Sequence, residues 1–226
     1  MTRVYYFSGS GHSKAVADYL ASRLETNAAE LTSYEGEFAA VAVVVFPVYC
    51  QNLPPMVKAF LRSLQADHAA LVATYGGFSP GNVLQEGAKL TAATVIAGSC
   101  IPTGHSFLRE AAVFDTPALE PLLARIRYPE EAVFPRLRKN PFSDLLPAWR
   151  SRIGLKIRKN QSCTACGVCA KLCPMSAMEN GTPTHKCIRC LRCVNNCPQN
   201  ALVIRSTLPM KLYLNRKRSP KLYLFL

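Results

Sequence analysis

The first 127 residues alternate between short apolar runs and segments whose apolar positions recur at helical spacing. Strands are predicted over residues 3–7, 28–31, 41–46, 70–75 and 94–98, and helices over residues 13–24, 55–64, 82–90 and the stretch "PALEPLLARI". The third strand, "VAVVVF", is apolar at every position, as expected of a parallel strand that is covered on both faces. This alternation predicts a doubly wound α/β domain with right-handed crossovers.

The pattern changes after residue 127. Residues 128–160 contain four prolines, the only tryptophan and many basic residues, and are interpreted as a connector with one short helix. Residues 161–205 form a cysteine-rich module. Residues 206–226 form a basic tail that contains "KLYL" twice. The predicted organisation is therefore a domain over 1–127, a connector over 128–160, a module over 161–205 and a tail over 206–226.

Composition excludes generic disorder, since 49% of the 226 residues are hydrophobic. The amino-terminal residues contain no apolar segment typical of a secretory signal. The longest mostly apolar run, "FAAVAVVVFPVYC", has 13 residues, which is too short to span a bilayer. We therefore expect a cytoplasmic protein without a transmembrane segment.

The net charge of +13 is unevenly distributed. Residues 1–135 carry 9 Lys/Arg and 12 Asp/Glu, whereas residues 136–226 carry 18 Lys/Arg and 2 Asp/Glu. Such an asymmetry suggests two parts with different partners. A basic half can face nucleic acid, an anionic membrane or an acidic protein.

Eight of the ten cysteines lie within residues 163–197, in two runs with the same spacing, C-x2-C-x2-C-x3-C-P, offset by 24 residues. This is the spacing that bacterial ferredoxins use for [4Fe–4S] clusters, in which the fourth cysteine of each run binds the other cluster. The first predicted ligand set is Cys163, Cys166, Cys169 and Cys197. The second predicted set is Cys173, Cys187, Cys190 and Cys193.

The module resembles the bacterial two-cluster ferredoxin. Both "CPMSAM" and "CPQNAL" match the Cys-Pro-x-x-Ala ending of that family, and Gly181 suits the turn between the halves. The alternative is a zinc site. Zinc usually takes four ligands as two separated pairs, and three cysteines at successive x2 spacings fit that arrangement poorly. Two [4Fe–4S] clusters are the predicted cofactors of the module.

The stretch "FSGSGHS" connects the first predicted strand to the first predicted helix. It lacks the lysine spacing of a Walker loop and the third glycine of a dinucleotide fingerprint. "GHSKA" narrowly misses the G-x-S-x-G pattern of hydrolases, which would make Ser13 a nucleophile. What remains is a loop of hydroxyls and backbone amides at a helix N-terminus, which suits a phosphate. Its candidate ligands are Ser8, Gly9, Ser10, Gly11, His12 and Ser13.

This loop resembles the FMN phosphate loop of flavodoxins, with Ser10 in place of Thr and His12 in place of Asn. The stretches "FPVYCQNLPP" and "TYGGFSPGN" resemble loops in proteins that join a short flavodoxin-like domain to a two-cluster ferredoxin. The resemblance implies a five-stranded parallel sheet of order 2-1-3-4-5 and a small α+β ferredoxin domain. It also implies that the two loops surround the flavin ring. The residues so implicated are Pro47, Val48, Tyr49, Gly76, Gly77 and Phe78. The loop "SCIPTGHSF" departs from the pattern of that fusion family.

The function implied is electron transfer that couples one-electron cluster chemistry to FMN, with unidentified redox proteins as partners. The alternative is a ferredoxin-type carrier whose flavodoxin-like domain binds no flavin and serves for docking. The hypothesis that the protein binds nucleic acid is supported only by the basic connector and tail, and the sequence contains no recognisable binding motif. The tail could contact an anionic membrane surface, but Pro220 interrupts any long amphipathic helix, which favours docking or disorder.

Overall fold

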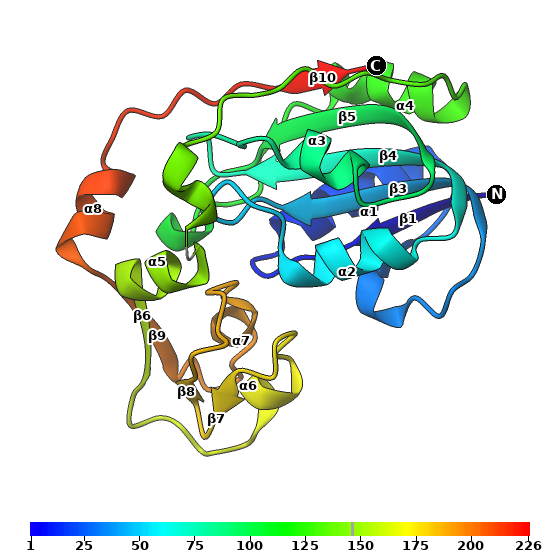
Figure 1. Ribbon diagram of the computed structural model, residues 1–226. Coiled ribbons are helices and arrows are strands. Elements are labelled where there is room, and N and C mark those ends of the chain that lie inside the picture. The colour runs from blue at the N-terminus through cyan, green and yellow to red at the C-terminus, as the bar shows by residue number, and fades with distance from the viewer. Residues whose placement is uncertain (146) are drawn as a thin grey trace. The chain divides into compact units, whose positions relative to one another are not determined.

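A computed structural model describes residues 1–145 and 147–226, and for residues 147–150 only the backbone is described (Figure 1). The chain divides into two compact units. The larger unit comprises Met1–Pro141 together with Arg218–Leu226, and the smaller unit comprises Phe142–Lys217. The division falls inside the segment that the sequence suggested was a connector, and the last nine residues return to the larger unit.

The larger unit is a doubly wound α/β domain, which confirms the predicted fold class. Its sheet has the order β10-β5-β4-β3-β1-β2, and β1 to β5 are parallel. The strands are β1 Thr2–Tyr6, β2 Ala28–Glu30, β3 Ala39–Pro47, β4 Ala66–Tyr75, β5 Thr94–Pro102 and β10 Tyr223–Phe225. The order 2-1-3-4-5 is as predicted, and each predicted strand overlaps an observed one.

The sheet has six strands rather than the five that were predicted. The sixth, β10, comes from the C-terminal tail and pairs antiparallel with β5 at the edge of the sheet. Its apolar residues are half-buried, and the Phe225 ring packs at 6.0 Å from Phe134. The tail therefore forms a strand because an open sheet edge offers unpaired backbone groups, which alternating Leu and aromatic residues can cover.

Helices cover both faces of the sheet. The helical segments of the unit are α1 His12–Arg23, α2 Pro55–Ser63, α3 Val83–Ala88 and α4 Glu120–Arg127, with 3-10 turns η1 Leu31–Ser33, η2 Ser106–Leu108 and η3 Pro117–Leu119. Apolar residues of α1 and α4 form one cluster with alternate residues of β1, β3, β4 and β5. Buried residues of α2 and α3 lie against the opposite face, which is toward the viewer in Figure 1. The continuously apolar β3 is buried on both sides, as its sequence predicts.

Residues 128–141 pack onto the larger unit instead of forming a free connector. Phe134 is buried so close to Gly98 that a Cβ at that glycine would lie 2.8 Å from the ring. Lys139 donates to Glu86 at 2.5 Å and to Asn52 at 3.0 Å. The basic side chain of Lys139 in this segment thus contacts residues of its own domain.

The smaller unit is a small α+β domain. It contains the antiparallel pair β6 Leu155–Lys159 and β9 Leu202–Ser206, and the short hairpin β7 Met178–Glu179 and β8 Thr182–Pro183. Its helical segments are α5 Pro147–Gly154, α6 Val168–Lys171, α7 Arg192–Asn195 and α8 Leu208–Leu214, and η4 Pro141–Asp144 lies at its start. Gly181 adopts a positive φ of 76° at the β7–β8 turn, in agreement with its expected role between the two halves.

Candidate functional site

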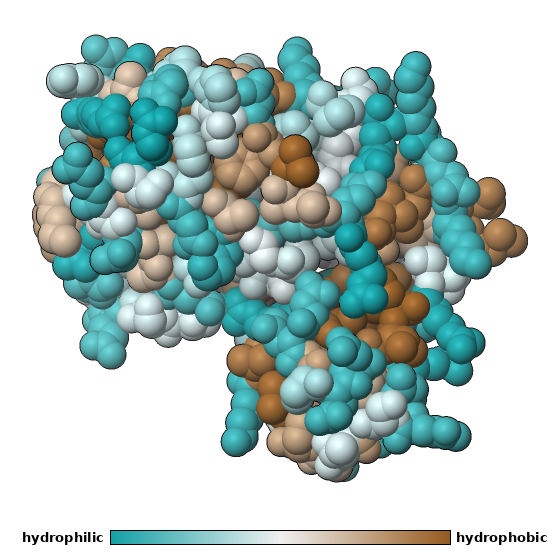
Figure 2. Space-filling model, turned by 180° about the vertical axis from the view of Figure 1, so that it is seen from behind, coloured by the Kyte–Doolittle hydropathy of each residue, from teal (hydrophilic) through white to brown (hydrophobic). Residues whose placement is uncertain are grey.

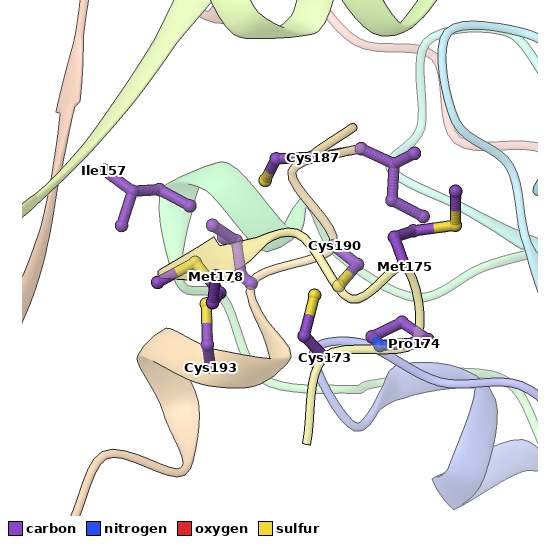
Figure 3. A pocket seen from close by; sticks show the side chains of 10 residues that line it. Ile157, Cys173, Pro174, Met175, Met178, Cys187, Cys190 and Cys193 are labelled. Atoms are coloured by element: carbon purple, nitrogen blue, oxygen red, sulfur yellow. The ribbon is translucent and has the colours of Figure 1, made fainter. Parts of the chain in front are cut away.

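The second predicted cysteine set lines one cavity. Cys173, Cys187, Cys190 and Cys193 surround a space of about 300 Å³. Figure 3 shows these side chains facing a common space, with Ile157 and Met178 to one side and Pro174 and Met175 to the other. Cys187, Cys190 and Cys193 are buried, and Cys173 is half-buried. Three of these cysteines thus come from the second run and the fourth comes from the first.

The first predicted cysteine set lines a second cavity. Cys163, Cys166, Cys169 and Cys197 border a space of about 580 Å³, together with residues of α6 and of the Asn180–Gly181 turn. Cys166 is exposed and the other three cysteines are half-buried. This cavity is therefore the more accessible of the two.

The two cysteine runs have the same backbone conformation. Left-handed φ values occur in pairs exactly one repeat apart, at Ala165 and Arg189, Gly167 and Leu191, and Ser176 and Asn200. Non-glycine residues adopt this conformation only at some energetic cost, so its recurrence shows that the loop geometry is imposed by the shared fold. A left-handed residue ahead of the second and third cysteine turns the chain tightly, so that successive thiols share one side of the loop.

The fourth cysteine of each run accepts a backbone hydrogen bond. The N–H of Ala177 donates to Cys173 Sγ at 3.2 Å, and the N–H of Ala201 donates to Cys197 Sγ at 3.3 Å. Each donor is the alanine of the Cys-Pro-x-x-Ala ending. Hydrogen bonds to sulfur are one of the means by which a protein adjusts the reduction potential of an iron–sulfur cluster. The alanine of this ending thus contributes its backbone N–H as a hydrogen-bond donor to the sulfur.

The electrostatic environments of the two sets differ. Burial raises the pKa of Cys190 to about 11 and that of Cys193 to about 12. At Cys197, burial opposes ionisation, but backbone N–H groups of residues 199–202 hold the pKa below its ordinary value. Since only the thiolate binds metal, the buried set needs a cationic centre to displace its protons.

The donor chemistry fits [4Fe–4S] clusters. Each cavity is bordered by four thiols, which is the ligand complement of one cluster. Within the described part of the chain, no three His, Cys, Asp or Glu side chains converge closely enough to hold a single metal ion. Each cavity is thus bordered by one of the two cysteine sets that the sequence predicted.

The Gly/Ser loop occupies the turn between β1 and α1. Gly11 has φ 94°, and a Cβ built on it meets nothing within 4 Å. No side chain caps the start of α1. The start of the helix thus lies at the surface at Gly11, which is exposed, with Ser10 half-buried beside it. This arrangement fits a phosphate.

Three side chains of the loop are engaged within the protein. Ser8 Oγ accepts from the N–H of Gly11 at 3.0 Å, and Ser13 Oγ lies 2.8 Å from Thr74 Oγ1. His12 Nε2 lies 2.9 Å from the carbonyl oxygen of Glu110. These three side chains thus fix the shape of the loop.

The two loops expected to surround the flavin ring lie at the carboxyl ends of β3 and β4. Pro47 ends β3 and Val48 donates its N–H to Thr74, while Tyr49 packs edge-on against Phe7. Phe78 packs edge-on against His105, with ring centroids 5.6 Å apart. These loops lie at the same end of the strands as the Gly/Ser loop, and this carboxyl end is where doubly wound folds bind cofactors.

His105 covers part of that edge. A Cβ built on Gly76 would lie 2.4 Å from His105 Cδ2, so the imidazole lies directly over the glycine. Burial lowers the pKa of His105 to about 4, with a further contribution from the positive charge of Arg218. The ring is therefore neutral at pH 7 and adds no charge to the site. No motif in the sequence assigns a role to His105, although its loop departs from the pattern of the fusion family.

The C-terminal segment reaches the same place. Arg218 donates to both carboxylate oxygens of Glu110 at 2.6 Å, and Ser219 donates its N–H to the carbonyl of Gly77 at 3.2 Å. The hydroxyl of Tyr75 donates to the carbonyl of Lys221 and accepts from its N–H. These contacts join residues more than 100 positions apart, and a single sequence contains no local signal for them.

Comparisons with known proteins agree with the two-part organisation. Residues 184–203 match the model of the Fer4 family, described as a 4Fe-4S binding domain. No curated protein sequence matches the chain.

Solved structures give weak resemblances. Rubredoxin oxygen:oxidoreductase from the anaerobe Desulfovibrio gigas has a TM-score of 0.44 and 13% identity over 55% of this chain, and the chain spans only 34% of that protein. A candidate flavoprotein from Bacteroides uniformis has a TM-score of 0.35 and 16% identity, over 48% of this chain and 94% of its own. Another candidate flavoprotein, from Bacteroides eggerthii, has a TM-score of 0.37 and 15% identity, over 56% of this chain and 97% of its own.

The larger unit thus has a flavodoxin-like fold, and the smaller unit contains a segment that matches a 4Fe-4S binding domain. The sheet order and the match over residues 184–203 carry these two statements. In the described ranges 1–145 and 147–226, none of the helices combines the length and apolar character needed to cross a bilayer.

Proposed function

We propose that this protein transfers electrons and carries two [4Fe–4S] clusters and FMN. The observation that carries the proposal is the division of eight cysteines into two groups of four around two cavities. Each group contains one cysteine from the other run, so each run contributes to both sites. Iron–sulfur clusters exchange single electrons, and a flavin can exchange one or two. A chain that carries clusters and a flavin would therefore couple one-electron transfer to two-electron transfer.

The chain's own residues supply binding and tuning in this proposal. The cysteine thiolates hold the clusters, and the amides of Ala177 and Ala201 donate to two of the sulfurs. The N-terminus of α1 and Ser10 bind the FMN phosphate. The loops at 47–49 and 76–78 flank the ring. No acid–base catalyst is required for electron transfer as such.

A second candidate is a ferredoxin-type carrier whose larger domain binds no flavin. It is favoured by His105, which lies over Gly76, and by Arg218 and Pro220, whose Cβ atoms lie within 3.7 Å of a Cβ built on Gly77. In this candidate the larger domain serves for docking, and the side chains over the two glycines are permanent parts of its surface.

Anaerobic purification followed by iron, sulfide and flavin analysis separates the two candidates. The first candidate requires about eight irons and eight sulfides per chain, together with acid-released FMN or rebinding of added FMN. The same iron content without flavin binding supports the second candidate. Zinc in place of iron would contradict both.

A charge placed in the phosphate loop tests the flavin site itself. Ser10→Glu should abolish FMN binding by repelling the phosphate, with iron content unchanged. Asn27→Glu is the matched control, because Asn27 is exposed immediately before β2, at the opposite end of the strands. Equal flavin binding by the Ser10 variant and the control would exclude this loop as the phosphate site.

A further inference from the structure

The smaller unit carries a large positive charge. Residues 142–217 contain 13 Lys/Arg and only two acidic residues, Asp144 and Glu179, which gives a net charge of +11. Two bound clusters with their thiolates would contribute about −4, so a large positive charge remains. Figure 2 shows long hydrophilic side chains projecting from this unit.

Part of this charge is concentrated on the β6–β9 pair. The strand register places Lys156 opposite Arg205 and Arg158 opposite Val203. These four residues are exposed, whereas Leu155 and Ile157 are buried on the other face. Lysine and arginine directly opposite each other destabilise a sheet. Neither Arg158 nor Arg205 forms an ion pair within the described residues.

The same face borders an open groove that is lined by residues 158–162 together with Val203 and Arg205. Its lining includes three cations, Arg158, Lys159 and Arg205, and no acidic residue. We call this groove, with its three cationic side chains, the basic groove. Such a surface attracts a partner of negative charge and increases the rate of encounter with it.

The basic groove is continuous with the more accessible cysteine set. Cys163 follows the groove residues directly and donates its N–H to the carbonyl of Asn160 at 3.3 Å. Lys159 donates to the carbonyl of Asn180 at 2.9 Å, and a Cβ built on Gly181 would contact both the Lys159 stem and Cys163 Sγ. A partner seated in the groove would therefore lie beside the site that contains the exposed Cys166.

We propose that the basic groove is the docking surface for an acidic electron-transfer protein, which exchanges electrons with the cluster held by Cys163, Cys166, Cys169 and Cys197. This inference rests on the proposed iron–sulfur function. One electron leaves the reduced cluster and enters the partner's redox centre, so the cluster is oxidised as the partner is reduced. A redox protein is favoured over nucleic acid or a membrane because the groove adjoins the accessible cluster site.

The test uses the dithionite-reduced holoprotein and acidic cytochrome b5 as the probe, with haem reduction followed by stopped-flow absorbance. The wild-type rate constant should fall as salt is added. Arg158→Glu combined with Arg205→Glu should lower it about tenfold or more at low salt, as expected when electrostatic steering is lost. Lys211→Glu combined with Lys217→Glu is the control, since both lysines are exposed in the same unit but lie outside the groove. The control should change the rate less than the groove variant does.

Iron content and the visible spectrum of each variant are measured first. Loss of iron in the wild-type protein would contradict the proposed function, whereas a normal iron content with an unchanged rate in the groove variant would overturn only the docking site. Equal losses in the groove variant and the control would also overturn it, because net charge would then explain the effect. Groove-dependent binding to duplex RNA or anionic vesicles without a change in the cytochrome rate would assign the surface to another partner and overturn the proposal.

Discussion

Replacing Glu110 with glutamine should loosen the C-terminal segment of the larger unit. Both carboxylate oxygens accept from Arg218 at 2.6 Å, and one of them also accepts from the N–H of His105 at 2.7 Å. Glutamine keeps the size of the side chain but loses the charge and one acceptor. The perturbation therefore tests the ion pair with little change in packing.

The magnitude follows from the acidity of the carboxyl group. The Arg218 guanidinium is the largest cause of a fall in the Glu110 pKa from 4.5 to about 2. At about 1.4 kcal/mol per pH unit, that difference sets an upper limit of about 3 kcal/mol. Each side chain is 32% exposed, so solvent screening reduces this contribution, and we expect a loss of about 1–2 kcal/mol.

The sign of the pH dependence follows from the depressed pKa. Because the folded state holds the carboxyl in its ionised form, the contribution is fully present above pH 4.5. It is lost as the pH falls from 4.5 toward about 2. The difference between Glu110→Gln and wild type should disappear over the same range.

Hydrogen exchange of residues 218–226 at pH 7, followed by mass spectrometry, measures the effect locally, and urea denaturation measures it globally. Glu120→Gln is the matched control because it breaks the more exposed Arg23–Glu120 pair, with side chains 43% and 47% exposed. Because solvent screens this exposed pair more strongly, the control should destabilise the protein less than Glu110→Gln does. If Glu110→Gln leaves exchange in the C-terminal segment at the wild-type rate, the ion pair does not hold that segment.

Three further variants test other parts of the structure. Cys197→Ser should lower the iron content from about eight toward about four per chain and leave the other cluster intact by electron paramagnetic resonance; loss of both signals would contradict independent cluster binding. Tyr75→Phe removes both hydrogen bonds to Lys221 and should cost about 1–3 kcal/mol in urea denaturation, whereas Tyr128→Phe, at an exposed site, should be neutral. His105→Ala clears the space over Gly76 and should tighten FMN binding in a fluorescence titration; unchanged affinity would show that the imidazole does not restrict the ring site.

The sheet order and the cysteine grouping could be predicted because their signals are local and periodic. An apolar run such as residues 41–46 reports burial on both faces, and alternation with helices restricts the topology to a few arrangements. The cysteine runs are more specific still. Their spacing forms tight loops, so that Ala165 and Arg189 take the same left-handed conformation although their side chains have nothing in common.

The C-terminal strand and the covering of the flavin edge could not be predicted in the same way. Tyr223–Phe225 is a three-residue strand whose partner lies more than 120 residues earlier, so its pairing depends on the open edge of β5 and not on local pattern. His105 lies in a loop over Gly76, and its backbone N–H donates to Glu110, which is itself paired with the distant Arg218. Such features come from tertiary contacts that override weak local preferences.

The return of the chain to the larger unit determines how the two units are connected along the sequence. Because Arg218–Leu226 belongs to the same unit as Met1–Pro141, the smaller unit is an insertion attached at both of its ends rather than a domain appended at one. β10 and the Glu110–Arg218 pair secure the second attachment. The contacts without a local sequence signal are thus those that make the smaller unit an insertion in the larger one.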